Sequence, residues 1–302
     1  MAENINRPNL LIVGAAKSGT TSLHNYLKQH PEIFMTEHKE PHFLINSEIG
    51  QKRVHKGVTE LEKYEQMFLT DVNYKYKGES SVMYLAFPEF SIKNIKKYLS
   101  SDVKIIIMLR NPVERAYAGY LHNLRYNPSE NLTFKQAIKE CEDRYQKDKE
   151  ITPDTRYLHV GNYYSQVKAF IDEFKLNTHI IFYDDYVKDI DYCLEKLFVF
   201  LEVKDVKIDT STRHMQGGWM FKNKYLRNLL IPKNNIKSIF KLLIPFQKIR
   251  SLLKNKIMAF STTSTPEFTK EMRNKLISYY HNDIVKLSKL LNTKLDHWIN
   301  EN

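Results

Sequence analysis

The stretch LLIVGAAKSGTTSL, residues 10–23, decides the predicted fold. It begins with four apolar residues typical of a short buried strand, turns at Gly14, and continues as a helical pattern from about Thr20 to His30. A turn of this kind points backbone N–H groups and the positive end of the helix dipole at an anion. The stretch therefore predicts a phosphate-binding loop, and an ordinary strand-to-helix turn is the alternative.

The loop departs from the nucleotide-binding pattern G-x-x-x-x-G-K-[ST] at one position. That pattern fits Gly14 to Thr21, except that Thr20 stands where the pattern has lysine. Lysine occurs instead at Lys17, inside the loop. Because a nucleotide triphosphatase needs its lysine at the position that Thr20 occupies here, we expect this loop to hold a different phosphate-like group.

Strands and helices alternate along the rest of the chain. Val103–Leu109 is an apolar run that indicates an interior parallel strand, and Pro112 suits the first turn of a helix ending near Tyr126. Further on we expect a helix at Tyr163–Phe174, a strand at His179–Tyr183 and a helix at Ile190–Leu201. This alternation predicts an α/β fold, namely a P-loop-like three-layer sandwich with a central parallel sheet.

The composition indicates a globular protein. The 302 residues are 42% hydrophobic, enough for a sizeable core, and we expect one domain over residues 1–302. Cys141 and Cys193 are too few for a disulfide framework or a four-cysteine zinc site, which favours a reducing compartment. The N-terminus is polar, and no apolar run approaches the roughly 20 residues that span a bilayer. We therefore expect a cytoplasmic location.

The positive charge is concentrated in residues 204–258. This segment holds 13 Lys or Arg and two acidic residues, a net charge of +11 that equals the net charge of the whole chain. Apolar residues at helical spacing between 225 and 257 predict a basic amphipathic insertion. Three interpretations stay open: the insertion contacts an anionic membrane, binds an acidic glycan or nucleotide, or is a solvated surface helix.

The segment GAAKSGTTSL resembles the 5′-phosphosulfate loop of sulfotransferases that use 3′-phosphoadenosine 5′-phosphosulfate (PAPS). The likeness is to bacterial-type members related to the heparan sulfate and other glycan sulfotransferases. It implies that the loop lysine and the hydroxyl residues after it hold the 5′-phosphate and the sulfuryl group. The matching residues are Lys17, Ser18, Gly19, Thr20, Thr21 and Ser22.

A second segment, LRNPVERAYAGYLHN at 109–123, resembles the 3′-phosphate motif of the same family. Arg110 matches the arginine of the motif, whereas Ala118 stands where the motif has serine, so one hydroxyl contact is missing. A planar guanidinium at the end of a buried strand also suits a phosphate on chemical grounds. The alternative is a structural arginine paired with a nearby acid.

The segment Lys39–Phe43 (KEPHF) resembles the acceptor-side motif of glycan sulfotransferases, in which the glutamate at the position of Glu40 is the proposed general base. A base is required because an acceptor hydroxyl is a poor nucleophile. A carboxylate close to Lys39 and Lys17 is expected to stay ionised. His42 is the rival base, since a neutral imidazole can take a proton near pH 7.

Two further segments resemble parts of the family site. KGESSVMYL at 77–85 resembles a substrate-side wall, with Ser80 in the place of a lysine that some members use. The substrate-side candidates are Lys39, Glu79, Ser81 and Tyr84. A loop near 213–224 resembles one that completes the nucleotide pocket, with Arg213, Lys222 and Lys224 as candidates.

The resemblance implies PAPS as co-substrate, 3′,5′-adenosine bisphosphate as product, and a saccharide or glycolipid hydroxyl or amine as acceptor. We expect no metal, because no His/Cys/Asp cluster has ligand spacing, and no nucleic-acid partner. Two other classes stay open on the residues alone. A P-loop kinase or NTPase should carry lysine after Gly19 and a Mg²⁺-binding aspartate. A non-catalytic module that binds polyanions or membranes would explain the basic segment alone.

Overall fold

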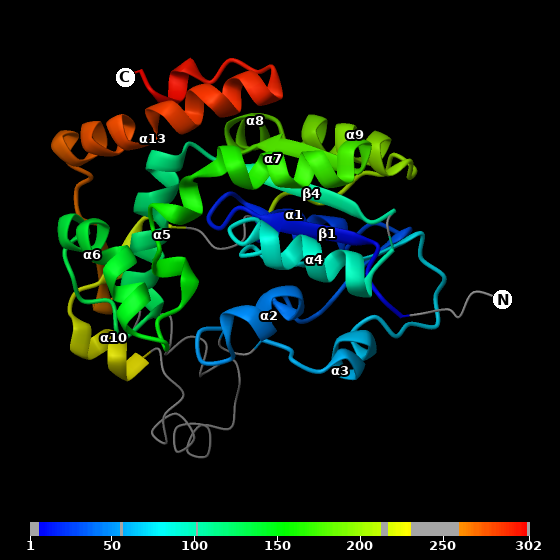
Figure 1. Cartoon of the computed structure of the whole chain (residues 1–302), viewed down its shortest axis with the longest axis horizontal. Helices are drawn as coiled ribbons and strands as arrows, with labels where there is room; N and C mark the ends of the chain where they lie inside the picture. Colours follow the sequence, from blue (N-terminus) through cyan, green and yellow to red (C-terminus); the bar gives the residue numbers. More distant parts are fainter. Residues whose placement is uncertain (1–5, 55–56, 101, 213–216, 231–259, 301–302) are drawn as a thin grey trace.

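The central feature of the fold is a parallel sheet of five strands (Figure 1). The structure is a computed structural model that describes residues 6–54, 57–100, 102–212, 217–230 and 260–300. The order of the strands is β2-β3-β1-β4-β5, and each neighbouring pair is parallel. Their bounds are β1 Leu10–Gly14, β2 Ile33–Met35, β3 Tyr76–Ser80, β4 Lys104–Leu109 and β5 Thr178–Phe182.

Both faces of the sheet are covered. Alternate side chains of a strand point to opposite faces, and those of β1 and β4 divide between two separate cores. One core contains Leu11, Val13, Ile105 and Ile107, and the other contains Leu10, Ile12, Ile106 and Met108. The sheet is therefore the middle of three layers, which confirms the predicted α/β sandwich.

The helices supply the two outer layers. The core with Leu10 is completed by α1 (Thr20–Leu27) and α9 (Ile190–Leu201). The core with Leu11 is completed by α2 (Phe43–Ile49), α4 (Pro88–Tyr98), α5 (Pro112–Tyr126), α6 (Phe134–Lys147), α7 (Tyr163–Phe174) and α13 (Lys270–Leu291). In Figure 1 helix α13 runs along the edge near the C-terminus, and α2 and α3 lie on the opposite side.

The other described elements are short. The helices are α3 (Leu61–Gln66), α8 (Tyr183–Lys188) and α10 (Lys224–Leu230). Single 3₁₀ turns occur at η1 (Pro153–Thr155), η2 (His159–Gly161), η3 (Lys175–Asn177) and η4 (Asp296–Trp298). Strands β6 (Trp219–Phe221) and β7 (Thr262–Ser264) form an antiparallel pair.

The predicted bounds agree closely with the observed ones. Helices Tyr163–Phe174 and Ile190–Leu201 begin and end as predicted. The strand predicted at His179–Tyr183 lies one residue earlier, because Tyr183 already begins α8. Helix α1 ends at Leu27 and not near His30, since the residue before a proline is disfavoured in the helical conformation.

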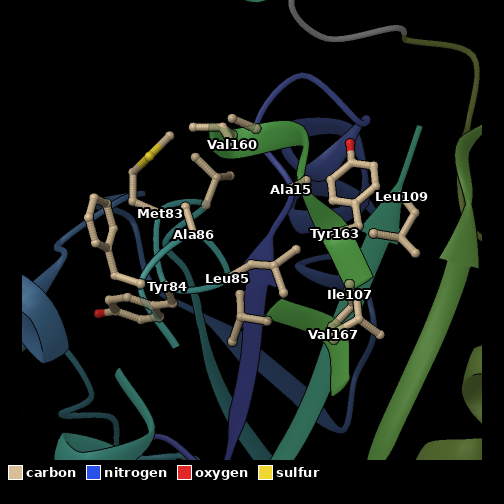
Figure 2. Packing of buried hydrophobic residues seen from close by; sticks show 14 of the residues in the cluster. Ala15, Met83, Tyr84, Leu85, Ala86, Ile107, Leu109, Val160, Tyr163 and Val167 are labelled. Carbon is tan, nitrogen blue, oxygen red and sulfur yellow. The ribbon is translucent and has the colours of Figure 1, made fainter. Parts of the chain in front are cut away.

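The end of β1 packs closely against the segment that follows β3. Figure 2 shows Met83, Tyr84, Leu85 and Ala86 beside Ala15, with Tyr163 and Val167 of α7 on the other side. The N–H of Leu85 donates a hydrogen bond of 2.8 Å to the carbonyl oxygen of Val13. A Cβ atom on Gly14 would lie 2.6 Å from Cβ of Leu85, so this position requires glycine. The loop between β1 and α1, predicted to bind phosphate, thus begins at a residue whose backbone is closely packed.

Candidate functional site

A cavity of about 770 Å³ opens where the parallel strands end. Its wall includes residues from the segments that follow all five strands of the parallel sheet, which is where open α/β sheets bind ligands. The polar and aromatic residues along the wall include Lys17, Thr20, Thr21, Ser22, Glu40, His42, Arg110, His122, Arg125, Asp154 and Tyr183. The cavity thus brings together both predicted motifs and both candidate bases.

The loop between β1 and α1 forms one side of the cavity. It turns sharply through two residues with left-handed backbone conformations, Lys17 at φ 69° and Gly19 at φ 91°. The N–H of Ala15 donates a 2.7 Å hydrogen bond to the carbonyl oxygen of Met108 in β4. Since Thr20 begins α1, the first turn of that helix faces the cavity. Of the predicted loop residues, Ser18 is fully buried and does not line the wall.

Lys17 contacts His122, a residue that the sequence motifs did not predict as part of the site. Its Nζ lies 3.1 Å from Nδ1 of His122 in α5. Burial, followed by the charge of Arg125, lowers the pKa of Lys17 to about 8, while Glu40 opposes that shift. His122 lies inside the segment 109–123, but only the folded chain reveals its contact with the loop.

Arg110 follows β4 and faces the same loop. Its Nη1 donates a 3.3 Å hydrogen bond to the carbonyl oxygen of Lys17, and its guanidinium carbon lies 4.8 Å from the ring centroid of Tyr183. Within the described part of the chain no carboxylate lies at ion-pair distance from Arg110, which argues against a structural ion pair. Ala118 also lines the cavity, so the expected serine hydroxyl is absent from the wall itself.

Glu40 projects from the segment after β2. Its carboxylate accepts a hydrogen bond of 2.6 Å from Nζ of Lys39, and its second oxygen lies 3.5 Å from Nε2 of His42. Burial alone would raise the pKa of Glu40, but the charge of Lys39 and the hydrogen bond from His42 outweigh it and hold that pKa well below its usual range. The side chain, 40% exposed, is thus an ionised carboxylate at the cavity wall.

Three substrate-side candidates form a buried cluster. The Glu79 carboxylate accepts hydrogen bonds from Ser81 Oγ at 2.8 Å, Tyr84 Oη at 2.7 Å and Tyr64 Oη at 3.2 Å. Burial raises the pKa of Glu79. Ser81 Oγ accepts a 3.0 Å hydrogen bond from the N–H of His42. These residues are fully buried and do not line the cavity, so in this structure they support the segment that carries the candidate bases.

The nucleotide-side candidates near 213–224 do not meet the cavity wall in the described part of the chain. Lys222 and Lys224 are exposed and do not line it, and Arg213 lies outside the described residues. Gly217 and Gly218, just before β6, do line it. This loop therefore contributes backbone to the wall.

Arg125 is a cation at the cavity wall that the sequence motifs did not mark. It is buried in α5, lines the cavity, and its Nη1 donates a 3.0 Å hydrogen bond to the carbonyl oxygen of Trp219 in β6. Burial is the largest cause of the lowered pKa values of Lys17 and His122, and the charge of Arg125 adds to both shifts. The site therefore has more positive potential than the two motifs predict.

The basic segment is only partly described. Residues 231–259, which include the helical pattern from Ile236 to Ile257, lie outside the described residues. In α10 the arginine Arg227 is 2% exposed and donates hydrogen bonds to the carbonyl oxygens of Leu124, Pro128 and Glu130. Part of the predicted insertion is therefore attached to the end of α5.

Among the described residues no three His, Cys, Asp or Glu side chains are grouped so that they could hold a metal ion. No helix in the same part of the chain combines the length and apolar character needed to cross a bilayer.

The family of the chain follows from comparison with known proteins. The family model described as "Sulfotransferase domain" matches residues 7–289. The chain belongs to this family. A crystal structure of a sulfotransferase from Alicyclobacillus acidocaldarius is 26% identical and superimposes with a TM-score of 0.74, covering 97% of this chain and 99% of the other.

Curated relatives of this sulfotransferase domain carry names that refer to carbohydrates. Carbohydrate sulfotransferase 15 of Rattus norvegicus is 23% identical over 65% of this chain and 44% of its own length. The bifunctional heparan sulfate N-deacetylase/N-sulfotransferase 1 of Xenopus laevis is 24% identical over 97% of this chain and 31% of its own length. The chain thus spans less than half the length of these relatives.

Proposed function

We propose that this chain transfers a sulfuryl group from PAPS to a hydroxyl or amine of a saccharide. The observation that carries the proposal is that one cavity contains Lys17, Glu40 and Arg110, which belong to three different strand ends. The names of the relatives support sulfuryl transfer to a carbohydrate. Family membership favours this function over the kinase and the non-catalytic module.

The residues of the cavity fit this donor. PAPS carries a 5′-phosphosulfate and a 3′-phosphate on its ribose, and the cavity wall offers the Lys17 ammonium of the loop and the Arg110 guanidinium at the end of β4. The first turn of α1 adds N–H groups and a positive dipole end. We propose that the loop binds the 5′-phosphosulfate and that Arg110 binds the 3′-phosphate.

The proposed reaction is an in-line displacement at sulfur. The donor provides an activated sulfuryl group whose leaving group is a phosphate oxygen. Glu40 removes the proton of the acceptor as the new S–O or S–N bond forms. Lys17 neutralises the charge that develops on the leaving oxygen, and the loop amides bind the non-bridging oxygens.

His42 remains the rival base in this proposal. Its Nε2 lies 3.5 Å from Glu40 Oε2, so the two side chains can act as a pair in which one orients the other. Glu40 is the more exposed of the two, 40% against 11% for the side chains, and we propose it as the group that meets the acceptor. The cluster around Glu79 is proposed to hold both in place.

The decisive experiment is calorimetry with 3′,5′-adenosine bisphosphate, the expected desulfated product. Tight binding without added metal, and turnover that survives EDTA, are the expected results. ATP with Mg²⁺ is the comparison ligand, because a P-loop kinase or NTPase would bind it in preference. Failure to bind the bisphosphate under any condition would remove the proposed donor.

The acceptor and the location are further parts of the proposal. A saccharide, free or on a glycolipid, is the proposed acceptor class, and the location is proposed to be cytoplasmic. Incorporation of labelled sulfate into oligosaccharides and into glycolipid vesicles would distinguish the two acceptor forms. Sedimentation with anionic vesicles would test membrane contact of the basic segment.

A further inference from the structure

Lys17 is held by a side chain from a distant helix. Its Nζ lies 3.1 Å from Nδ1 of His122, 105 residues further along the chain, and both residues line the cavity. Neither the loop motif nor the proposed mechanism gives His122 a role. The contact therefore calls for a separate explanation.

The protonation state of His122 is defined by its partner. An ammonium group only donates hydrogen bonds, so Nδ1 must accept and the ring proton must lie on Nε2. Burial, together with the charges of Lys17 and Arg125, lowers the pKa of His122 to about 3. The imidazole is therefore neutral near pH 7 and can orient the ammonium without repelling it.

Charged groups from several elements face this pair. Burial is the largest influence on the pKa of Lys17, and the charges of Arg125 and Lys39 add to the lowering. Glu40 and Asp154 oppose it, and the resulting pKa is about 8. In the described chain neither carboxylate lies at ion-pair distance from the ammonium. The imidazole is thus the contact that fixes the direction of the lysine side chain.

The position of His122 on α5 is also informative. It follows Ala118 by four residues, so the two lie on the same face of the helix, and both line the cavity. Ala118 is the position where the family resemblance implies a serine. On this face of α5 the polar side chain toward the cavity is therefore His122, one helical turn after the position where the motif has serine.

We propose that His122 is a positioning residue that holds the Lys17 ammonium over the cavity through its Nδ1 atom. This inference rests on the proposed function, in which Lys17 carries the charge that stabilises the leaving phosphate. Loss of the hydrogen-bond acceptor Nδ1 of His122 would leave the Lys17 ammonium without this hydrogen bond. Its charged form would then be less favoured, and Lys17 would release its proton at a lower pH.

The test measures proton uptake when 3′,5′-adenosine bisphosphate binds. Calorimetric titrations in two buffers with different ionisation enthalpies give the number of protons taken up. Near pH 7.5, with Lys17 fully protonated in the complex, the parent should take up about 0.2 protons. His122→Phe keeps an aromatic ring but has no hydrogen-bond acceptor for the Lys17 ammonium. If the pKa of Lys17 then decreases by about one unit, the uptake should rise to about 0.8 protons.

Two variants control for a merely structural effect. His122→Asn places an acceptor oxygen at the same number of bonds from the backbone as Nδ1 and should return the uptake to the parent value. His179→Phe changes another histidine with a pKa lowered by burial, which stacks on Phe200 at 5.0 Å and does not line the cavity. It should leave the uptake unchanged. Parent-like uptake in His122→Phe, or His122→Asn matching His122→Phe, would overturn the proposal.

A measurement on the parent protein covers the case in which His122→Phe does not fold. The ¹⁵N chemical shifts of the imidazole report its tautomer, and the proposal requires a proton on Nε2 and none on Nδ1 at neutral pH. The opposite tautomer, or an imidazolium, would overturn it. Absence of bisphosphate binding by the parent would contradict the proposed function, whereas the tautomer would still decide the role of His122.

Discussion

The backbone N–H of Glu40 donates a hydrogen bond of 2.9 Å to the carbonyl oxygen of Ser80, the last residue of β3. The side chain of Ser80 lies 2.8 Å from Nδ1 of His24 in α1, the helix that follows the phosphate loop. The candidate base and the loop are thus connected through one residue at the end of a central strand. Because both segments are held by hydrogen bonds to Ser80, we expect substitutions of Glu40 or of the loop residues to change the reaction itself and not the position of a flexible loop.

Replacement of Glu40 separates catalysis from binding. Glu40→Gln keeps the size of the side chain and removes the proton acceptor, so kcat should fall by roughly 10²–10⁴. Affinity for 3′,5′-adenosine bisphosphate should stay close to the parent value. His42→Gln is the matched variant, and the larger loss of kcat identifies the base. If both variants turn over like the parent, neither residue is the base.

Replacement of Lys17 should affect turnover and stability in opposite directions. Lys17→Met removes the charge that stabilises the leaving oxygen, so kcat should fall by at least about 10². The pKa of Lys17 is lowered from 10.5 to about 8, so at pH 7 the partly buried cation destabilises the folded protein. The variant should therefore unfold about 2–6 °C higher than the parent. An unchanged kcat would remove Lys17 from the mechanism.

The pH dependence of donor use follows from the same pKa. Lys17 is protonated below about pH 8 and loses its charge as the pH rises through that value. The kcat/KM for PAPS should therefore fall above about pH 8, approaching tenfold per pH unit. Lys17→Arg keeps its charge at high pH and should lose this alkaline decrease, even at a lower absolute rate. A decrease that persists in Lys17→Arg would assign it to another group.

Arg110 tests the other end of the donor. Arg110→Ala removes a charged contact to the proposed 3′-phosphate, which should raise the KM for PAPS by roughly 10–100-fold and change kcat much less. Arg110→Lys should recover part of the affinity, because the charge stays and the planar fork is lost. An unchanged KM in the alanine variant would show that Arg110 does not bind the donor.

Arg227 tests the attachment of α10. Arg227→Ala removes the buried guanidinium that donates to three carbonyl oxygens near the end of α5, and should lower the free energy of unfolding by about 2–4 kcal/mol. Lys224→Ala, an exposed position on the same helix, should change it by less than about 0.5 kcal/mol. Chemical denaturation of both variants gives the comparison, and equal stabilities would mean that α10 contributes little to the fold.

The parts of the fold with strong local patterns were predictable. The phosphate loop, the apolar strand before Arg110 and the helices after it carry their signals within a few neighbouring residues. Strand β3, with the sequence YKGES, was not predictable, because it has no apolar alternation and is defined by pairing with β1 and β2. The fold class follows from the first kind of signal, whereas the order of the strands in the sheet does not.

The candidate site also contains residues that were predictable from local sequence and contacts that were not. Glu40 and Lys17 were found from motifs, but the contact of Lys17 with His122 joins residues 105 positions apart and leaves no local trace. Glu79 was predicted to be part of a substrate-side wall, and its burial away from the cavity was missed, since its partners Tyr64, Ser81 and Tyr84 meet it only in the folded chain. Arg125 and Arg227 show the same limit, because burial of a charged side chain depends on distant carbonyl groups.

The strand order β2-β3-β1-β4-β5 has a consequence for altering this protein. The segments that carry Lys17, Arg110 and Tyr183 follow β1, β4 and β5, whereas those that carry Glu40 and Ser81 follow β2 and β3. Under the proposed function, the segments after β1, β4 and β5 bind the sulfuryl donor, and those after β2 and β3 form or support the acceptor side. Exchange of the segments after β2 and β3 with those of a relative should therefore transplant acceptor preference as a module and leave recognition of the donor intact.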